Sequence, residues 1–325
     1  MSIAFLEGNS DRKEFSLNKG IRWSLMTIFT LLYVVLMLNV GIFNAATSQI
    51  KKDFKLDNKE FGLLGTFNGG GRIIGTLLFM IIINKYNRKF VIIIPLLINA
   101  FSIYLFTKTN NKKILYIERG INGICQVFGF IYFPIWIDQF GIQKRKTLMM
   151  TFIQLSAPIG MVFGYCFNTF FKSWKKGFLF ESFGEIIFIS ILLFFPKKYF
   201  SKNLFFKGHF NSYFNVNNNN KQKISIFYNT NEIKNNNNLL KNIFSLLLNK
   251  MFLMTVLYKS TTQFICAGIG FWLTDYLENQ LKIKNNLHKL YSYINIIVIG
   301  PMIGLFFGGI ITNYTGGYEK KKVYF

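Results

Sequence analysis

The sequence contains few of the residues on which catalysis and metal binding depend. Of its 325 residues, only two are histidines and three are cysteines, and 14 acids stand against 38 Lys and Arg residues. The cysteines, Cys125, Cys166 and Cys266, match no zinc-binding or redox spacing. No nucleophile–base pair or metal-ligand cluster is recognisable, so we expect no enzyme, no catalytic residue, no metal and no cofactor.

The sequence also lacks a polar domain that could present its net charge of +24 to a nucleic acid. Lys and Arg lie mostly in short stretches between apolar runs, where they would meet lipid headgroups and set membrane topology. We therefore expect a lipid bilayer, and not a nucleic acid, as the surrounding partner.

Apolar residues, by contrast, are abundant and occur in long runs. Hydrophobic residues make up 51% of the chain and aromatic residues 18%. A membrane-spanning helix needs roughly 20 mostly apolar residues, and its backbone polar groups must be satisfied within the helix. We predict an all-α integral membrane protein whose spans are Arg22–Ala46, Phe61–Ile83, Phe90–Phe106, Ile114–Ile137, Thr147–Phe170, Phe178–Phe195, Phe252–Leu273 and His288–Thr312.

The spans fall into two groups separated by a polar, Asn-rich stretch. We expect a cytoplasmic tail (1–21), a six-helix N-terminal bundle (22–196), a cytoplasmic loop (197–244) and a partial C-terminal bundle of two helices (245–325). The excess of Lys and Arg on one side places the N-terminus in the cytoplasm. The membrane is either the plasma membrane or an internal one such as that of a lysosome or vacuole.

Two predicted turns carry related motifs. The first is Asn84-Lys85-Tyr86-Asn87-Arg88-Lys89, and the second is Gly309-Ile-Ile-Thr-Asn313-Tyr-Thr-Gly316-Gly317. Both resemble the G-x-x-x-D-R-x-G-R/K signature of the major facilitator superfamily, and Arg119-x-x-Asn122-Gly123 resembles its R-x-x-Q-G element. The resemblance implies a carrier with two helical halves that works by alternating access.

A narrower resemblance is to the Spinster-type transporters. It rests on Lys52-Asp53-Phe54, Gly62-Leu63-Leu64, Pro134-Ile-Trp-Ile-Asp138-Gln-Phe140 and Ala157-Pro158-Ile159-Gly160. This branch implies a lysophospholipid, a sphingolipid or a related amphipathic substrate, often moved with protons. The chain ends soon after the second signature, about four spans short of two six-helix halves. We therefore expect either a truncated gene model or a degenerate member of the family.

Several family acids are amides in this sequence. Asn39-Val40 stands where the branch carries an Asp-Arg pair, Gln126 replaces a glutamate, and Asn84 and Asn313 replace the signature aspartates. Amides form hydrogen bonds but do not titrate near neutral pH. We therefore do not expect proton coupling through these family positions.

Three bases lie within the predicted spans, namely Arg72, Arg119 and Lys259. A charge at membrane depth costs roughly 2.5–3.5 kcal/mol and usually faces a cavity or a partner. We expect these bases, together with Asn39 and Gln126, to bind an anionic headgroup, with Arg the better bidentate partner. Alternatively, Arg72 pairs with backbone carbonyls of a neighbouring helix, and Lys259 extends its amine to the membrane surface.

Other residues have simpler predicted roles. Glu118 is expected at the end of span four and Glu181 and Glu185 at the end of span six, while Trp136 and Trp174 are expected to anchor span ends at the interface. The signature turns are expected to supply the gating residues Asn84, Lys85, Arg88, Lys89, Asp138, Gly309, Asn313, Gly316 and Gly317.

The sequence thus favours a secondary or facilitative transporter of a small anionic amphipath. A second hypothesis is a degenerate family member that acts as a membrane receptor or scaffold without transporting anything.

Overall fold

The computed structural model describes residues 17–83, 85–109, 111–142, 145–200, 248–283 and 285–314. Asn84, Gly316, Gly317 and most of the Asn-rich loop lie outside these residues, and for Asn313 only the backbone is described.

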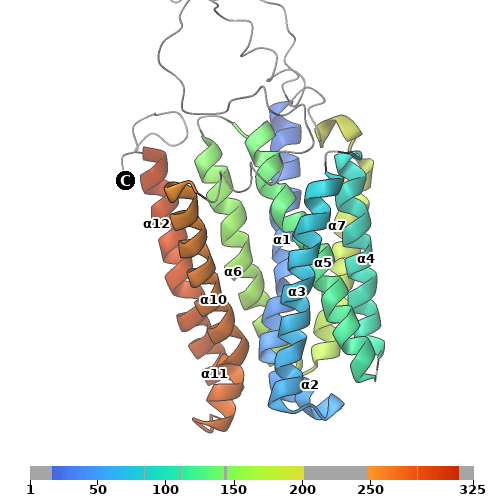
Figure 1. The fold of residues 1–325 in the computed structure, drawn as a ribbon, viewed down its shortest axis with the longest axis vertical. Coiled ribbons are helices and arrows are strands. Elements are labelled where there is room, and N and C mark those ends of the chain that lie inside the picture. Colours follow the sequence, from blue (N-terminus) through green and yellow to red (C-terminus); the bar gives the residue numbers. More distant parts are fainter. Residues whose placement is uncertain are drawn as a thin grey trace, which may run out of the picture.

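The described chain is almost entirely helical (Figure 1). Its elements are α1 (Lys19–Ala45), α2 (Thr47–Phe54), α3 (Asn58–Ile82), α4 (Arg88–Lys108), α5 (Lys112–Phe140), α6 (Lys146–Phe171), α7 (Trp174–Phe194), η2 (Lys197–Tyr199), α10 (Lys250–Asn279), α11 (Asn286–Tyr293), η5 (Ile294–Ile299) and α12 (Gly300–Tyr314). The long helices run side by side, and short α2 lies across one end of the bundle, called here the α2 end. The beginning of α1 and the end of α12 lie at the opposite end.

Seven helices among the described residues are long and apolar enough to cross a membrane. They are α1, α3, α4, α5, α6, α7 and the continuous helix Asn286–Thr312 formed by α11, η5 and α12. The predicted span Phe252–Leu273 falls in α10, which is 30 residues long, about 45 Å, but is not among the seven. Each of the eight predicted spans thus corresponds to a long helix of the structure, and α10 is the least apolar of them, with polar residues such as Gln263 lining a cavity.

Asparagine, abundant in the sequence, is used repeatedly to begin helices. The side chains of Asn18, Asn87, Asn111, Asn249 and Asn285 each accept a hydrogen bond from a backbone N–H in the first turn of the following helix. Such caps satisfy N–H groups that have no partner within the helix. Asp57 and Glu60 form a reciprocal capping box at the start of α3.

Glycines allow two helix pairs of the N-terminal bundle to pack at very close range. A Cβ atom on Gly164 of α6 would lie 2.3 Å from the backbone oxygen of Leu38 in α1. A Cβ atom on Gly123 of α5 would lie 2.2 Å from the backbone oxygen of Asn68 in α3. Because membrane helices gain little from the hydrophobic effect between them, such backbone proximity is a main source of their association. The pairs α1–α6 and α3–α5 are therefore closely fitted.

Two tryptophans expected at the membrane interface are instead buried in the bundle. Trp136 is 0% exposed and Trp174 is 2% exposed. The indole N–H of Trp136 donates to the backbone oxygen of Tyr199 (2.9 Å), and that of Trp174 donates to Asp53 Oδ2 (2.7 Å). The expectation of interfacial anchors is wrong for both, because each indole finds a hydrogen-bond partner inside the protein.

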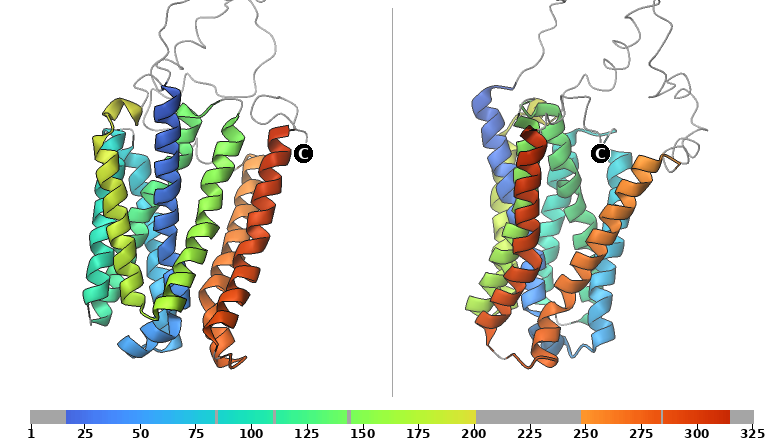
Figure 2. Two further views of the ribbon diagram at one scale, coloured as in Figure 1. Left: turned by 180° about the vertical axis from the view of Figure 1, so that it is seen from behind. Right: turned by 90° about the vertical axis from the view of Figure 1, so that its left-hand side faces the viewer.

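The helices α10, α11 and α12 lie along one side of the N-terminal bundle, with α11 and α12 next to α6 and the end of α10 next to α1 and α2 (Figures 1 and 2). Residues 250–269 of α10 are all exposed, and the first buried residue is Gly270. Among the described residues, α10 therefore packs against the bundle only through its last third, close to the α2 end.

The close fit of α1 and α6 predicts a matched pair of glycine variants. Gly164→Ala should destabilise the protein by about 1–3 kcal/mol, because the added methyl group has no room beside Leu38. Gly268→Ala on α10 should be neutral or stabilising by up to about 1 kcal/mol, because nothing lies within 4 Å of its added Cβ. Thermal unfolding of the two purified variants in detergent provides the comparison. Equal melting temperatures would contradict the packing described here.

Candidate substrate cavity

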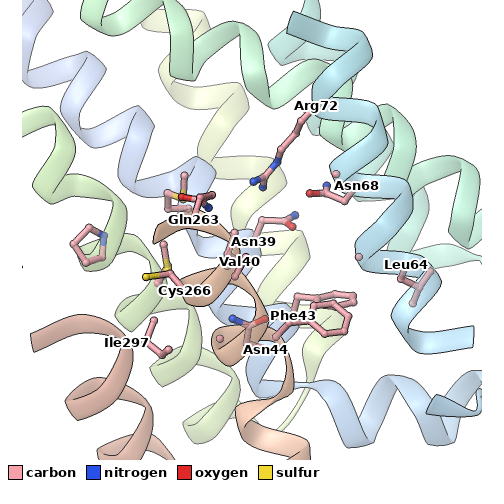
Figure 3. A pocket seen from close by; sticks show the side chains of 18 of the residues that line it. Asn39, Val40, Phe43, Asn44, Leu64, Asn68, Arg72, Gln263, Cys266 and Ile297 are labelled. Carbon is pink, nitrogen blue, oxygen red and sulfur yellow. The ribbon is translucent and has the colours of Figure 1, made fainter. Parts of the chain in front are cut away.

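A cavity of about 360 Å³ lies between the N-terminal bundle and α10–α12 (Figure 3). Its walls are mainly apolar and aromatic, with polar groups from α1, α3, α5, α10 and α11. The apolar side chains include Met37, Val40, Phe43, Leu64, Met161, Phe271 and Ile297. The polar side chains are Asn39, Asn44, Asn68, Arg72, Arg119, Gln263, Cys266 and Tyr293.

Arg72 points from α3 into the space between Asn68, Asn39 and Gln263 (Figure 3). Its Nε is buried and has no hydrogen-bond partner among the described residues. It lies over the ring of Phe130, with 5.9 Å between the guanidinium carbon and the ring centre. In the described part of the chain no backbone carbonyl accepts a hydrogen bond from this guanidinium, contrary to the alternative that Arg72 serves helix packing.

Arg119 also borders the cavity, and the protein holds it through one nitrogen and the ring faces around it, whereas its Nε and Nη2 are buried without a hydrogen-bond partner among the described residues. It is 3% exposed, and its Nη1 donates to Asn39 Oδ1 at 2.9 Å. Its Nε lies 3.9 Å from Glu118 Oε2. Three aromatic rings enclose its guanidinium carbon at 4.0, 4.6 and 5.3 Å, namely those of Phe43, Phe106 and Phe178. Such enclosure stabilises a cation in an apolar surrounding.

The other two predicted binding residues do not line the cavity. Gln126 is fully buried, and its Nε2 donates to the backbone oxygen of Leu36 at 3.4 Å. Lys259 is exposed on α10, one turn from the cavity residue Gln263 and on the same face of the helix. The structure thus brings Asn39, Arg72 and Arg119 together and leaves Gln126 and Lys259 outside.

The described residues of the first signature turn connect helix ends. Arg88 Nη1 donates to Gln139 Oε1 at 2.7 Å, and Lys89 Nζ donates to the backbone oxygens of Leu193 and Phe195, both at 2.7 Å. Lys85 is exposed. These contacts join the start of α4 to the ends of α5 and α7.

Two further predicted gating residues lie where α6 meets its neighbours. Asp138, at the end of α5, pairs with Lys146 at the start of α6 over 2.5 Å. Gly309 of α12 lies against Thr151 of α6, whose Oγ1 would be 2.2 Å from a Cβ atom at this glycine.

Polar contacts close the cavity toward the α2 end. Lys51 of α2 forms an ion pair with Asp275 of α10. Glu278 accepts hydrogen bonds from Ser48 and Lys289. Nearer the cavity, Asn44 donates to the hydroxyl group of Tyr293 at 3.2 Å. The sequence analysis missed this network, because residues such as Lys51 and Asp275 are far apart in the chain and each resembles an ordinary loop charge.

Three glutamates lie deeper in the bundle than expected. Glu118 is 5% exposed, and Glu181 and Glu185 are both 0% exposed. Glu185 lies near the middle of α7, and Glu118 lies between the middle and the start of α5. The expected position at a span end is wrong for Glu181 and Glu185, because α7 begins at Trp174, four residues before the predicted span. The bundle interior therefore holds more acids than the sequence indicated.

These features define a class of protein. A bundle of apolar helices with a mainly apolar cavity that holds a few polar groups between two sets of helices, closed at one end, is the architecture of carriers that expose a central site to one side at a time. A sequence profile for the Major Facilitator Superfamily matches residues 29–323, and the chain belongs to this family of membrane transporters. A comparison with curated proteins finds no match. The superfamily resemblance and the all-α carrier fold are thus confirmed.

The ion pair at the α2 end predicts how the cavity opens there. In a background with Cys125→Ser and Cys166→Ser, Cys266 is the one thiol left, and it lines the cavity. Asp275→Asn removes the partner of Lys51, so we expect a membrane-impermeant maleimide added from the α2 side to label Cys266 about fivefold faster. That factor corresponds to about 1 kcal/mol for a partly exposed ion pair.

Lys112→Gln is the matched control for this experiment. It removes the ion pair of Lys112 with Glu60 (2.9 Å), which joins α5 to α3 within the N-terminal bundle. Labelling of Cys266 should keep its original rate in this variant. Equal rates in the Asp275→Asn variant and its parent would show that the Lys51–Asp275 pair does not hold the cavity closed.

Proposed function

We propose that this transporter carries a small, anionic amphipathic solute by alternating access, with Arg72 as the main ligand of the anion. The observation that supports the proposal most directly is the guanidinium of Arg72. It faces the cavity, and its Nε is buried without a partner among the described residues. A guanidinium offers five N–H donors that fit carboxylate or phosphate oxygens in pairs.

The charge of the cavity lining favours an anion. Arg72 and Arg119 both border the cavity, and the described residues that line it include no Asp or Glu. The surrounding amides of Asn39, Asn68 and Gln263 can donate further hydrogen bonds to an anionic headgroup. Because Arg119 is held by Asn39 and three aromatic rings, we assign it to shaping the site and Arg72 to direct contact.

The apolar walls favour an amphipathic substrate. Phe43 and Phe271 form an aromatic pair with ring centres 5.7 Å apart, and Met37, Met161 and Ile297 add flexible or branched apolar surface. A volume of about 360 Å³ lies toward the small end of the range for ligand sites. A charged headgroup with the adjoining part of an acyl chain suits this combination.

The Spinster-type motifs support a lysophospholipid or a sphingolipid as the substrate. The excess of Lys and Arg at one end of the bundle supports an N-terminus in the cytoplasm. Membership of the superfamily and a cavity between the two helix sets favour transport over the receptor or scaffold hypothesis. Asn39 and Arg119 belong to the proposed site, Gln126 and Lys259 to its surroundings, and the signature turns to gating.

The role of Arg72 is tested by binding of two lysophospholipids to the purified full chain. Arg72→Ala should weaken binding of a phosphomonoester lysophospholipid about ten- to hundredfold, because a charge-assisted hydrogen bond contributes about 1.5–3 kcal/mol. Binding of a zwitterionic lysophosphatidylcholine should change much less, and Arg72→Lys should retain part of the affinity for the anionic lipid.

Arg22→Ala is the control, because Arg22 donates to the backbone oxygen of Leu17 at the start of α1 and does not border the cavity. It should bind both lipids as the parent does. If the parent protein binds neither lipid, or if Arg72→Ala binds the anionic lipid as tightly as the parent, the proposed substrate class is wrong.

A further inference from the structure

Three buried glutamates form a group on α5 and α7, in which Glu118 and Glu181 lie near Arg119 and Glu185 lies near Glu181. Glu118 precedes Arg119 on α5, and Glu181 and Glu185 are one turn apart on the same face of α7. All three carboxyl groups are at least 95% buried. Burying a carboxylate is costly unless it is paired with a cation or fully hydrogen-bonded.

Too few cations face these acids to neutralise them. Arg119 on α5 is the one base within 4 Å of any of the three carboxyl groups among the described residues, at 3.9 Å from Glu118 Oε2. Arg72 on α3 faces the cavity. The other helices packed here present neutral groups, namely Asn39 on α1, Asn99 and Ser102 on α4, and Asn122 and Cys125 on α5. Three carboxylates would therefore leave a net negative charge inside the bundle.

The hydrogen bonds of each glutamate fit a neutral acid better than a carboxylate. One oxygen of each accepts a bond, from Ser102 to Glu118 Oε1 (3.4 Å), from Asn39 to Glu181 Oε2 (3.3 Å) and from Asn99 to Glu185 Oε1 (2.7 Å). The second oxygen of each is buried without a hydrogen-bond partner among the described residues. A buried carboxylate that lacks a donor at one oxygen leaves a charge poorly stabilised, whereas a protonated carboxyl group has no charge to stabilise.

The missing positive charge is better supplied by protons than by a metal ion. No group of three or more acids, histidines or cysteines in the described residues is arranged so that it could hold a metal. We propose that Glu118, Glu181 and Glu185 form a proton-binding site in which the otherwise unpartnered carboxyl oxygens carry the protons.

Hydrogen bonds connect this site to the cavity by two routes. In the first, Arg119 donates to Asn39, which donates to Glu181. In the second, Asn68 donates to Asn122 (3.0 Å), Asn122 donates to Asn99 (2.9 Å), and Asn99 donates to Glu185. Asn39, Asn68 and Arg119 all line the cavity. Because the side-chain amide of Asn39 bonds to both Glu181 and Arg119, loss of a proton from Glu181 acts on Arg119 through this one amide.

The proposed proton-binding site does not use the positions at which the family carries acids and this sequence carries amides. Asn39 and Gln126 occupy the family's acidic positions and cannot titrate. Glu181 is hydrogen-bonded to Asn39 from the neighbouring helix α7. Proton binding here does not depend on the proposed substrate, whereas its coupling to transport rests on the proposed function.

Infrared difference spectroscopy of the purified full chain tests the proton-binding site directly. Spectra recorded in H₂O and D₂O should contain a deuterium-sensitive C=O band of protonated carboxyl groups that persists at neutral pH. Glu181→Gln, Glu185→Gln and Glu118→Gln should each be compared with the parent, and at least one should lose part of this band. Glu60→Gln, at a partly exposed acid paired with Lys112, is the control and should leave the band unchanged.

Two results would overturn the proposal. One is a parent spectrum without the band, which needs no variant to fold. The other is a band that disappears when sodium replaces choline at constant pH, which would identify a metal cation as the ligand. A band of equal size in all three folded variants would equally reject these glutamates as its source.

Uptake of the anionic lysophospholipid by proteoliposomes then separates this inference from the proposed function. Uptake should depend on pH in the parent and in Glu60→Gln, and this dependence should be lost in Glu181→Gln. Absence of uptake in every variant, with the infrared band present, would contradict the proposed function and leave the proton-binding site standing. Unaltered pH dependence in a folded Glu181→Gln variant would contradict the coupling.

Discussion

The structure depends on one buried cation, the guanidinium of Arg119. Its partners come from four helices: Asn39 and Phe43 from α1, Phe106 from α4, Glu118 from α5 and Phe178 from α7. A charge in an apolar bundle persists only where a polar or aromatic shell replaces water. Building that shell fixes how α1, α4, α5 and α7 meet, places Asn39 on the cavity wall and brings Glu181 of α7 within hydrogen-bond distance of Asn39.

The contacts inside the N-terminal bundle differ in kind from the contacts between this bundle and α10–α11. Inside the N-terminal bundle, α1–α6 and α3–α5 are fitted backbone to backbone by glycines that leave no space for a side chain. Between this bundle and α10–α11, the contacts at the α2 end combine ion pairs such as Lys51–Asp275 with apolar and aromatic contacts such as Tyr165–Tyr293 and Phe61–Phe271. The polar part of this junction can exchange its partners for water, so it suits a closure that must break and re-form during a transport cycle.

The lengths of the apolar runs in the sequence predict the long helices, but not the side-chain contacts between them. The first span was expected at Arg22–Ala46 and α1 is Lys19–Ala45. The beginning of α7 was missed because Lys175 and Lys176 resemble a loop, and this error moved Glu181 and Glu185 to a helix end. The asparagine contacts and the Lys51–Asp275 pair join residues far apart in the chain, and no single-sequence pattern encodes such pairings. Motif and position together indicated Arg119, but only the contacts in the structure, a bond to Asn39 and three ring faces, distinguish its guanidinium from that of Arg72.

The central claim is that the cavity must open at the α2 end for solute to cross. Ser48 and Glu278 are in contact there, from α2 and α10. In a chain with its three cysteines replaced by serine, Ser48→Cys and Glu278→Cys can be joined by a short, cleavable bifunctional thiol reagent. The account predicts that joining them abolishes proteoliposome uptake of the anionic lysophospholipid and that cleavage restores it. Undiminished uptake by the fully cross-linked protein would contradict the account.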